Sequence, residues 1–153
     1  IHKKNKNKNL YESISAYGVG FHRHNSEIKQ QLENYTNEKV KFNFTPHLTP
    51  MFRGILSTIY IDLKSKITLL KINNELNKFY YKDYFIKILK KNTFLSTNDV
   101  INTNFCHISV CKTKYKNKIV ILSAIDNLIK GGAGQAVQNM NIYYNYNIKK
   151  GLL

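Results

Sequence analysis

The strongest constraint on the fold is a pair of apolar segments, 105–111 and 119–124, joined by the hydrophilic stretch 112–118. Short apolar runs bounded by polar residues are typical of strands that face a protein core. A polar connection of this length is typical of a hairpin between neighbouring strands. We therefore expect an antiparallel strand pair here, and a fold organised around a sheet.

Strand and helix patterns follow one another along the rest of the chain without a strict β–α–β repeat. Strands are predicted over 13–21, 40–44, 55–63 and 84–89. Helices are predicted after a cap at Asn25 or Ser26, over 67–81, and from the glycine run 131–134 toward Tyr144. This mixture favours an α+β fold, with a mostly antiparallel or mixed sheet covered by helices.

Length and composition limit the class of protein. The chain has 153 residues, of which 42% are apolar, enough for one domain with a core. No apolar run approaches the ~20 residues of a membrane span, and two cysteines make no disulfide framework, so we expect a cytoplasmic protein. Residues 1–10 are rich in Lys and Asn, and we expect a disordered or truncated end there. The first residue is Ile1 rather than Met, which suggests a piece of a longer reading frame.

The formal net charge of +15 has two interpretations. Lysines are scattered along the whole chain together with many Asn, Ile and Tyr, which favours compositional bias on a solvated surface. The alternative is a long-range field that attracts anionic ligands. Only Arg23 and Arg53 are arginines, and proteins that recognise base edges rely on arginine, so nucleic-acid binding is kept only as an alternative.

The densest group of titratable residues is His22-Arg23-His24 with Glu27. A histidine can transfer a proton near neutral pH, a carboxylate can orient its imidazole, and an arginine can bind a phosphate or carboxylate through two hydrogen bonds. The spacing of the other histidines matches no metal motif, so we expect no metal. The alternative is that these are ordinary loop residues.

Three further features are weaker candidates. Arg53 follows a loop bracketed by two prolines and could bind an anion or lie on the surface. The glycine run 131–134 could expose N–H groups at a helix N-terminus, although it lacks the dinucleotide-binding spacing. Cys106 and Cys111 lie in an apolar strand pattern, where cysteines are usually inert.

The order of the motifs is more specific than any one of them. They are AYG at 16–18, HRHNSEI at 22–28, FTPHLTPM at 44–51, RGIL at 53–56, TNFCHISV at 103–110, SAIDNL at 123–128 and GQAVQNMN at 134–141. Together they resemble the C-terminal half of the N-acetyl-gamma-glutamyl-phosphate reductase family, which is semialdehyde dehydrogenase-like. The resemblance extends from about Tyr11 to the C-terminus.

The resemblance implies a specific activity. The family reduces N-acetyl-L-glutamyl 5-phosphate to the 5-semialdehyde with NADPH and releases phosphate, in arginine biosynthesis. A Rossmann domain holds NADP, a cysteine thiolate attacks the acyl phosphate, and hydride transfer follows. Residues 11–153 would form the second, α+β domain, which completes the active site and makes the contact of a homodimer or homotetramer.

The resemblance also assigns roles to residues. His22 would be the catalytic acid/base. The substrate would contact Arg23, His24, Glu27 and Arg53. The cofactor would contact Gly134, Gln135 and Asn139. The helix at 131–145 would pack on the NADP-binding domain.

Departures from the family pattern limit what this chain can do alone. The Rossmann half and the segment with the nucleophilic cysteine are absent, and Cys106 matches a strand cysteine instead. Ser26 replaces the usual proline. We therefore expect the chain alone to be inactive. A related substrate, the aminoadipyl phosphate of lysine biosynthesis, is an alternative.

Overall fold

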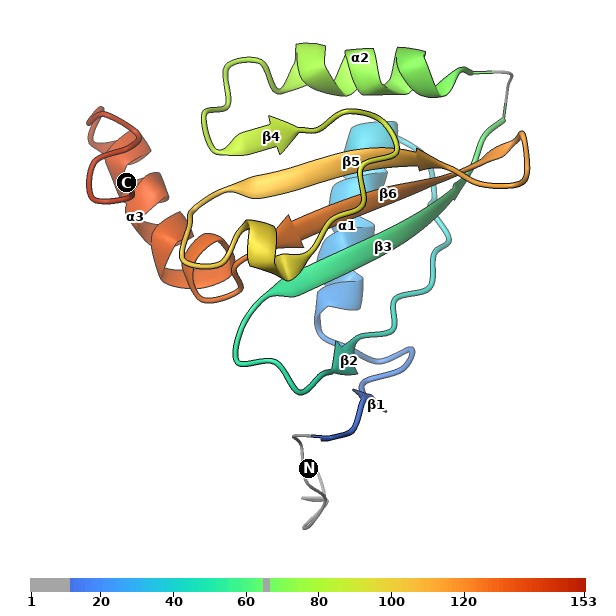
Figure 1. Cartoon of the computed structure of the whole chain (residues 1–153), viewed down its shortest axis with the longest axis horizontal. Coiled ribbons are helices and arrows are strands. Elements are labelled where there is room, and N and C mark those ends of the chain that lie inside the picture. Colours follow the sequence, from blue (N-terminus) through green and yellow to red (C-terminus); the bar gives the residue numbers. More distant parts are fainter. Residues whose placement is uncertain (1–11, 65–66) are drawn as a thin grey trace. The chain divides into compact units, whose positions relative to one another are not determined.

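The computed structural model describes residues 12–64 and 67–153, so the predicted disordered or truncated end at 1–10 lies outside the described residues. The chain divides into two compact units, Ile1–Phe52 and Arg53–Leu153. Both units are coloured by sequence in Figure 1.

The described part of the first unit, residues 12–52, contains one α-helix and one short strand pair. Strand β1 (Ser15–Ala16) pairs antiparallel with β2 (His47–Leu48). Helix α1 spans His24–Thr36 and ends at Asn37, whose φ of 53° is left-handed. Arg23 holds the N-cap position without a side-chain hydrogen bond. The predicted cap at Asn25 or Ser26 is therefore wrong, because the helix begins before both residues.

Two strands predicted in this unit are shorter or absent. The strand predicted over 13–21 is reduced to β1, because Gly18 and Gly20 adopt positive φ values of 57° and 75° and turn the chain. Over 40–44 the side chains alternate between half-buried and exposed, as predicted, but the segment is not a strand. An alternating pattern decides which side chains are buried, whereas a strand also needs a hydrogen-bonded neighbour.

The second unit is built on a four-stranded sheet in the order β3-β6-β5-β4. The strands are β3 (Ile55–Asp62), β4 (Ile86–Ile88), β5 (Cys106–Lys112) and β6 (Lys118–Ile125). The β3–β6 and β5–β6 pairs are antiparallel, and the β4–β5 pair is parallel. The predicted hairpin is confirmed as β5–β6, and β3 confirms the strand predicted at 55–63.

Helices complete this unit (Figure 1). Helix α2 (Leu69–Phe79) confirms the helix predicted at 67–81, and its first turn is capped by Thr68, whose Oγ1 accepts from the Lys71 N–H at 3.2 Å. It packs on β4 and β5. Beyond β6, the π-helical turn η3 (Ile129–Ala133) leads into α3 (Gly134–Tyr143).

A small apolar core holds the unit together. Leu95, Val100 and Ala124 are buried against one another, with Leu89 and Leu122 packed beside them. The 3-10 turn η2 (Thr97–Asp99) lies between the first two and contacts β6. The predicted α+β class, a mixed and mostly antiparallel sheet with helices, is confirmed.

Candidate functional site

His22 is held in one orientation by its neighbours in the first unit. The backbone N–H of His24 donates to His22 Nδ1 at 3.2 Å. The imidazole makes edge contacts with the rings of Tyr17, His24 and Phe44, at centroid distances of 5.4, 4.7 and 5.4 Å. A Cβ atom at Gly18 would lie 3.2 Å from His22 Cβ and Cδ2, so glycine is needed at that turn.

This hydrogen bond defines what His22 can offer chemically. Because Nδ1 accepts, the neutral ring carries its proton on Nε2. The half-buried imidazole therefore presents an N–H donor at Nε2. Such a group can donate a hydrogen bond to an oxygen on which negative charge develops.

The other members of the cluster lie around the start of α1 and are exposed. Within residues 12–64 and 67–153 the guanidinium of Arg23 has no hydrogen-bond or ion-pair partner, which leaves it available to an anion. Glu27 lies in the first turn of α1 as predicted, where the helix dipole favours it. In the same described residues it makes no hydrogen bond to either imidazole, so the backbone of His24, not a carboxylate, orients His22.

Arg53 belongs to a hydrogen-bonded network in the second unit, which we call the Asp126 hub. Its Nη1 donates to Asn102 Oδ1 at 3.0 Å and forms an ion pair with Asp126 Oδ2 at 3.3 Å. The Asn127 side chain accepts from the N–H of Gly54 at 2.6 Å. The structure therefore favours the structural role of Arg53 over that of a free anion-binding arginine.

Asp126 is fully buried and has four donors. Its carboxylate accepts from the backbone N–H groups of Asn102, Leu128 and Ile129 at 2.9, 2.8 and 3.0 Å, besides Arg53. Burial raises the pKa of Asp126, but the three N–H groups and the guanidinium outweigh burial and hold the pKa below its ordinary value of 3.8. Sequence reasoning missed this residue, although an Asp directly before a helical turn is a common cap.

Three of the four N–H groups in the glycine run 131–134 are used within the chain. The N–H groups of Gly131, Ala133 and Gly134 donate to the carbonyls of residues 126, 128 and 129. The interpretation of this run as an exposed helix N-terminus is therefore wrong. Gly134 is buried, and a Cβ atom there would lie 2.5 Å from Asn104 Oδ1, so its glycine serves close packing.

The other two residues predicted to contact the cofactor lie on α3. Gln135 Nε2 donates to Asn139 Oδ1 at 2.8 Å, one helical turn apart. Gln135 is half-buried and Asn139 is exposed. Their contact with a cofactor stays a prediction.

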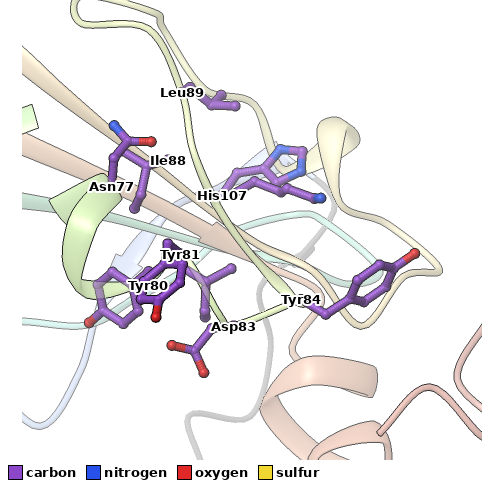
Figure 2. A pocket seen from close by; sticks show the side chains of 10 residues that line it. Asn77, Tyr80, Tyr81, Asp83, Tyr84, Ile88, Leu89 and His107 are labelled. Carbon is purple, nitrogen blue, oxygen red and sulfur yellow. The ribbon is translucent and has the colours of Figure 1, made fainter. Parts of the chain in front are cut away.

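A hollow that sequence reasoning missed lies elsewhere in the second unit. We call it the β4 pocket. It measures about 610 Å³ and is formed by the end of α2, the turn that follows, β4 and one residue of β5. Figure 2 shows it, with side chains that include Tyr80, Tyr81, Asp83, Tyr84 and His107.

The cysteines have structural surroundings. Cys106 Sγ lies 3.5 Å from Ser123 Oγ, and the buried Cys111 Sγ lies 3.6 Å from the Thr93 carbonyl. In the described part of the chain, neither thiol is hydrogen-bonded to a histidine, which agrees with inert strand cysteines.

Two searches of the described residues complete this survey. Among residues 12–64 and 67–153, no cluster of three or more His, Cys, Asp or Glu side chains is arranged to hold a metal ion. No helix in the same residues combines the length and apolar character needed to cross a bilayer.

Residues 1–127 match the family described as semialdehyde dehydrogenase, dimerisation domain. The chain belongs to this family. It is 48% identical over 133 residues to N-acetyl-gamma-glutamyl-phosphate reductase of Thermoanaerobacter pseudethanolicus, covering 87% of this chain and 39% of that protein. It is 43% identical over 151 residues to the reductase of the same name in Clostridium novyi, covering 96% of this chain and 43% of that protein. The chain thus spans about two fifths of the length of these curated relatives.

Solved structures of the semialdehyde dehydrogenase family share the fold. Aspartate semialdehyde dehydrogenase from Francisella tularensis superposes with a TM-score of 0.61 at 14% identity, covering 78% of this chain and 34% of that one. Aspartate semialdehyde dehydrogenase II from Vibrio cholerae gives 0.60 at 16% identity, covering 84% and 38%. The resemblance to the N-acetyl-gamma-glutamyl-phosphate reductase family drawn from the motifs is confirmed by the curated relatives.

Proposed function

We propose that this chain supplies the second domain of an NADP-dependent reductase that converts N-acetyl-L-glutamyl 5-phosphate to N-acetyl-L-glutamate 5-semialdehyde and phosphate. The observation that carries the proposal is the 48% identity over 87% of the chain to a relative named N-acetyl-gamma-glutamyl-phosphate reductase. Identity this high over most of a domain supports a shared reaction as well as a shared fold. The reaction is a step of arginine biosynthesis.

In this proposal the catalytic acid/base His22 assists the first step as a hydrogen-bond donor. Attack of a thiolate on the acyl phosphate places negative charge on the carbonyl oxygen, and collapse with loss of phosphate leaves a thioester. A donor aimed at that oxygen lowers the barrier. The Nε2–H of His22 is suited to this role because Nδ1 is occupied by the His24 N–H. The thiolate itself would come from residues outside this chain.

Arg23 is the better placed of the two arginines for the substrate phosphate. Its exposed guanidinium lacks a partner among residues 12–64 and 67–153, whereas Arg53 Nη1 is paired with Asp126. A guanidinium with free N–H groups can bind a phosphate through two hydrogen bonds. We also assign His24 and Glu27, which follow Arg23 in the first turn of α1, to contacts with the substrate.

We place only part of the NADP site on this chain. The N–H groups of Gly131, Ala133 and Gly134 are used within the chain, so they offer no cradle for a pyrophosphate. Gln135 and Asn139 keep amide groups at the surface of α3 that could contact a carboxamide. NADP supplies the hydride when it is bound, and we place most of its contacts on a separate Rossmann domain against which 131–145 would pack.

The assembly and location follow from the family and the chemistry. The matched family is described as a dimerisation domain, which supports a homodimer or homotetramer. Both cysteines are free thiols. Free thiols without disulfides are usual in a reducing compartment, which supports a cytoplasmic enzyme.

Reconstitution tests this function. The chain is mixed with the cofactor domain of the Thermoanaerobacter pseudethanolicus relative, and phosphate-dependent reduction of NADP⁺ by N-acetylglutamate semialdehyde is followed by absorbance. We expect activity in the mixture and none with either part alone. A mixture that co-elutes as a complex but stays inactive would contradict the proposal. Faster turnover of the aminoadipyl semialdehyde would change the substrate and keep the reaction type.

A further inference from the structure

Two lysine ammonium groups lie near the ring of Tyr84, which lines the β4 pocket; Lys87 lines the pocket as well, whereas Lys149 does not. The Lys87 ammonium lies 5.3 Å from the centroid of the Tyr84 ring, and the Lys149 ammonium lies 3.6 Å from the same centroid. The two like charges are thus less than about 9 Å apart, a distance comparable with the Debye length of roughly 8 Å at physiological salt. Within residues 12–64 and 67–153, neither ammonium is paired with a carboxylate.

Lys87 and Lys149 are held in place by different elements of the second unit. Lys87 is the central residue of β4, held in the sheet by its pairing with β5. Lys149 is held by Asn141, which is fully buried on α3 and donates to the carbonyls of Ile148 and Lys150 at 3.3 and 2.9 Å. Holding two cations beside one ring has an electrostatic cost, which an anion bound between them would offset.

The remaining walls suit a planar ring and a sugar. Tyr80, Tyr81 and Tyr84 line the pocket (Figure 2), and tyrosine faces stack on nucleobases. Asp83, an exposed carboxylate in the turn before β4, can accept from hydroxyl groups. A volume of about 610 Å³ is within the range of small-ligand sites, roughly 300–1,000 Å³.

His107 adds an unsatisfied polar group. Its Nδ1 is buried and has no hydrogen-bond partner among the described residues. Burial lowers the pKa of His107 below its ordinary value of 6.5, and Lys87 lowers it as well, although Asp99 raises it. The imidazole is thus held neutral in the wall of the pocket. A neutral ring does not compete with the lysines for a bound anion.

We propose that the β4 pocket binds a nucleoside phosphate. Lys87 in the wall and Lys149 beside the Tyr84 ring hold the phosphate, Tyr80 and Tyr81 stack on the base, and Asp83 accepts from the ribose hydroxyls. The proposal does not depend on the reductase function, because the site shares no residue with those assigned to the substrate or to NADP. It gives the chain a second nucleotide site beside the one expected on the Rossmann domain.

Calorimetric titration of the full chain with ADP, without NADP or substrate, tests the proposal. We expect saturable one-site binding that weakens roughly tenfold in Lys87→Gln and in Lys149→Gln, the size of one lost charge-assisted hydrogen bond. Lys114→Gln is the matched control, because Lys114 also lies 5.0 Å from a tyrosine ring, that of Tyr115, but outside the pocket. ADP binding should be unchanged in this control.

Three results would overturn the proposal. The first is that ADP does not bind. The second is that Lys114→Gln weakens ADP binding as much as the other two substitutions, which would indicate attraction by net charge alone. The third is that inorganic phosphate binds as tightly as ADP, which would show that the nucleoside makes no contact. Retained affinity in Tyr81→Leu would contradict the stacking role. Because reductase activity is not measured, a negative titration leaves the proposed reaction standing, and an inactive reconstituted enzyme leaves the pocket standing.

Discussion

The Asp126 hub and the β4 pocket lie in the same unit and treat charge in opposite ways. In the hub a fully buried carboxylate is surrounded by four donors, so its charge is compensated. At the pocket, the ammonium groups of Lys87 and Lys149 lie beside the ring of the lining residue Tyr84, with no carboxylate partner among the described residues. The paired charges of the hub therefore stabilise the fold, whereas the unpaired ammonium groups at the pocket are available to bind a ligand.

Substitution of Asp126, at the centre of the hub, should have the largest effect on the free energy of unfolding. Asp126→Ala should lower the free energy of unfolding by about 3–5 kcal/mol, because it leaves the Arg53 guanidinium and three N–H groups without their acceptor. Urea unfolding followed by circular dichroism measures this. Asp62→Ala is the matched control, since Asp62 pairs with Lys118 on the surface and should cost about 0–1 kcal/mol. A similar loss of unfolding free energy in both variants would contradict the special role of the buried carboxylate.

Gly54 tests the backbone of the hub. Its φ is 112°, and a Cβ atom would lie 2.7 Å from Thr97 Cβ, so Gly54→Ala should cost about 1–3 kcal/mol. Gly151→Ala is the control, because Gly151 also has a positive φ, 72°, but open space around it. The difference in unfolding free energy between the two variants measures the steric contact alone. No difference would mean that Thr97 moves aside.

The hub and the pocket should also titrate separately. The pKa of Asp126 is below 3.8 in the folded chain, so the unfolded chain takes up the proton first, and the stability that this residue contributes is lost as the pH falls below 3.8. The pKa of His107 is below 6.5, so its neutral form favours the folded state and stability declines as the pH falls below 6.5.

Unfolding midpoints measured across this pH range test whether stability falls with pH in both ranges, as expected. In Asp126→Asn, the fall in stability below pH 3.8 should become smaller, and the fall below pH 6.5 should be unchanged. In His107→Gln the opposite is expected. Asp99 and Lys87, the charged groups that shift the His107 pKa, are unchanged in both variants. Stability that rises as the pH falls through either range would contradict the assignment.

The smallest expected effect on stability is in the pocket. Lys87→Gln removes a cation near the Tyr84 and Phe105 rings and should change the unfolding free energy by no more than about 1 kcal/mol. Thermal unfolding with and without ADP sharpens the comparison, since the variant should lose most of the stabilisation by ligand. A large loss of stability without ligand would make Lys87 structural, like the hub.

Sequence patterns predicted the parts of the fold that depend on local hydrophobic order. Strand β3, helix α2 and the β5–β6 hairpin lie where the pattern places them. The predictions failed where long-range contacts decide. The segment 40–44 alternates in exposure but lacks a paired neighbour.

The candidate site shows the same division. The motif at 22–27 was recognisable from residue types, but the hydrogen bond from the His24 N–H to His22 Nδ1 depends on a turn that the sequence does not reveal. Asp126 and Arg53 are 73 residues apart, and the two lysines of the β4 pocket come from β4 and the C-terminal segment. Contacts between such distant positions arise only when the sheet has formed.

Turnover by the reconstituted enzyme with His22→Asn tests the central claim most directly. If His22 is the catalytic acid/base, phosphate-dependent reduction of NADP⁺ should fall by about 10²–10⁴-fold, the usual contribution of a positioned acid/base. His47→Asn, an exposed histidine of β2, is the matched control and should keep its rate. A wild-type rate for His22→Asn in a complex that still assembles would remove His22 from the mechanism.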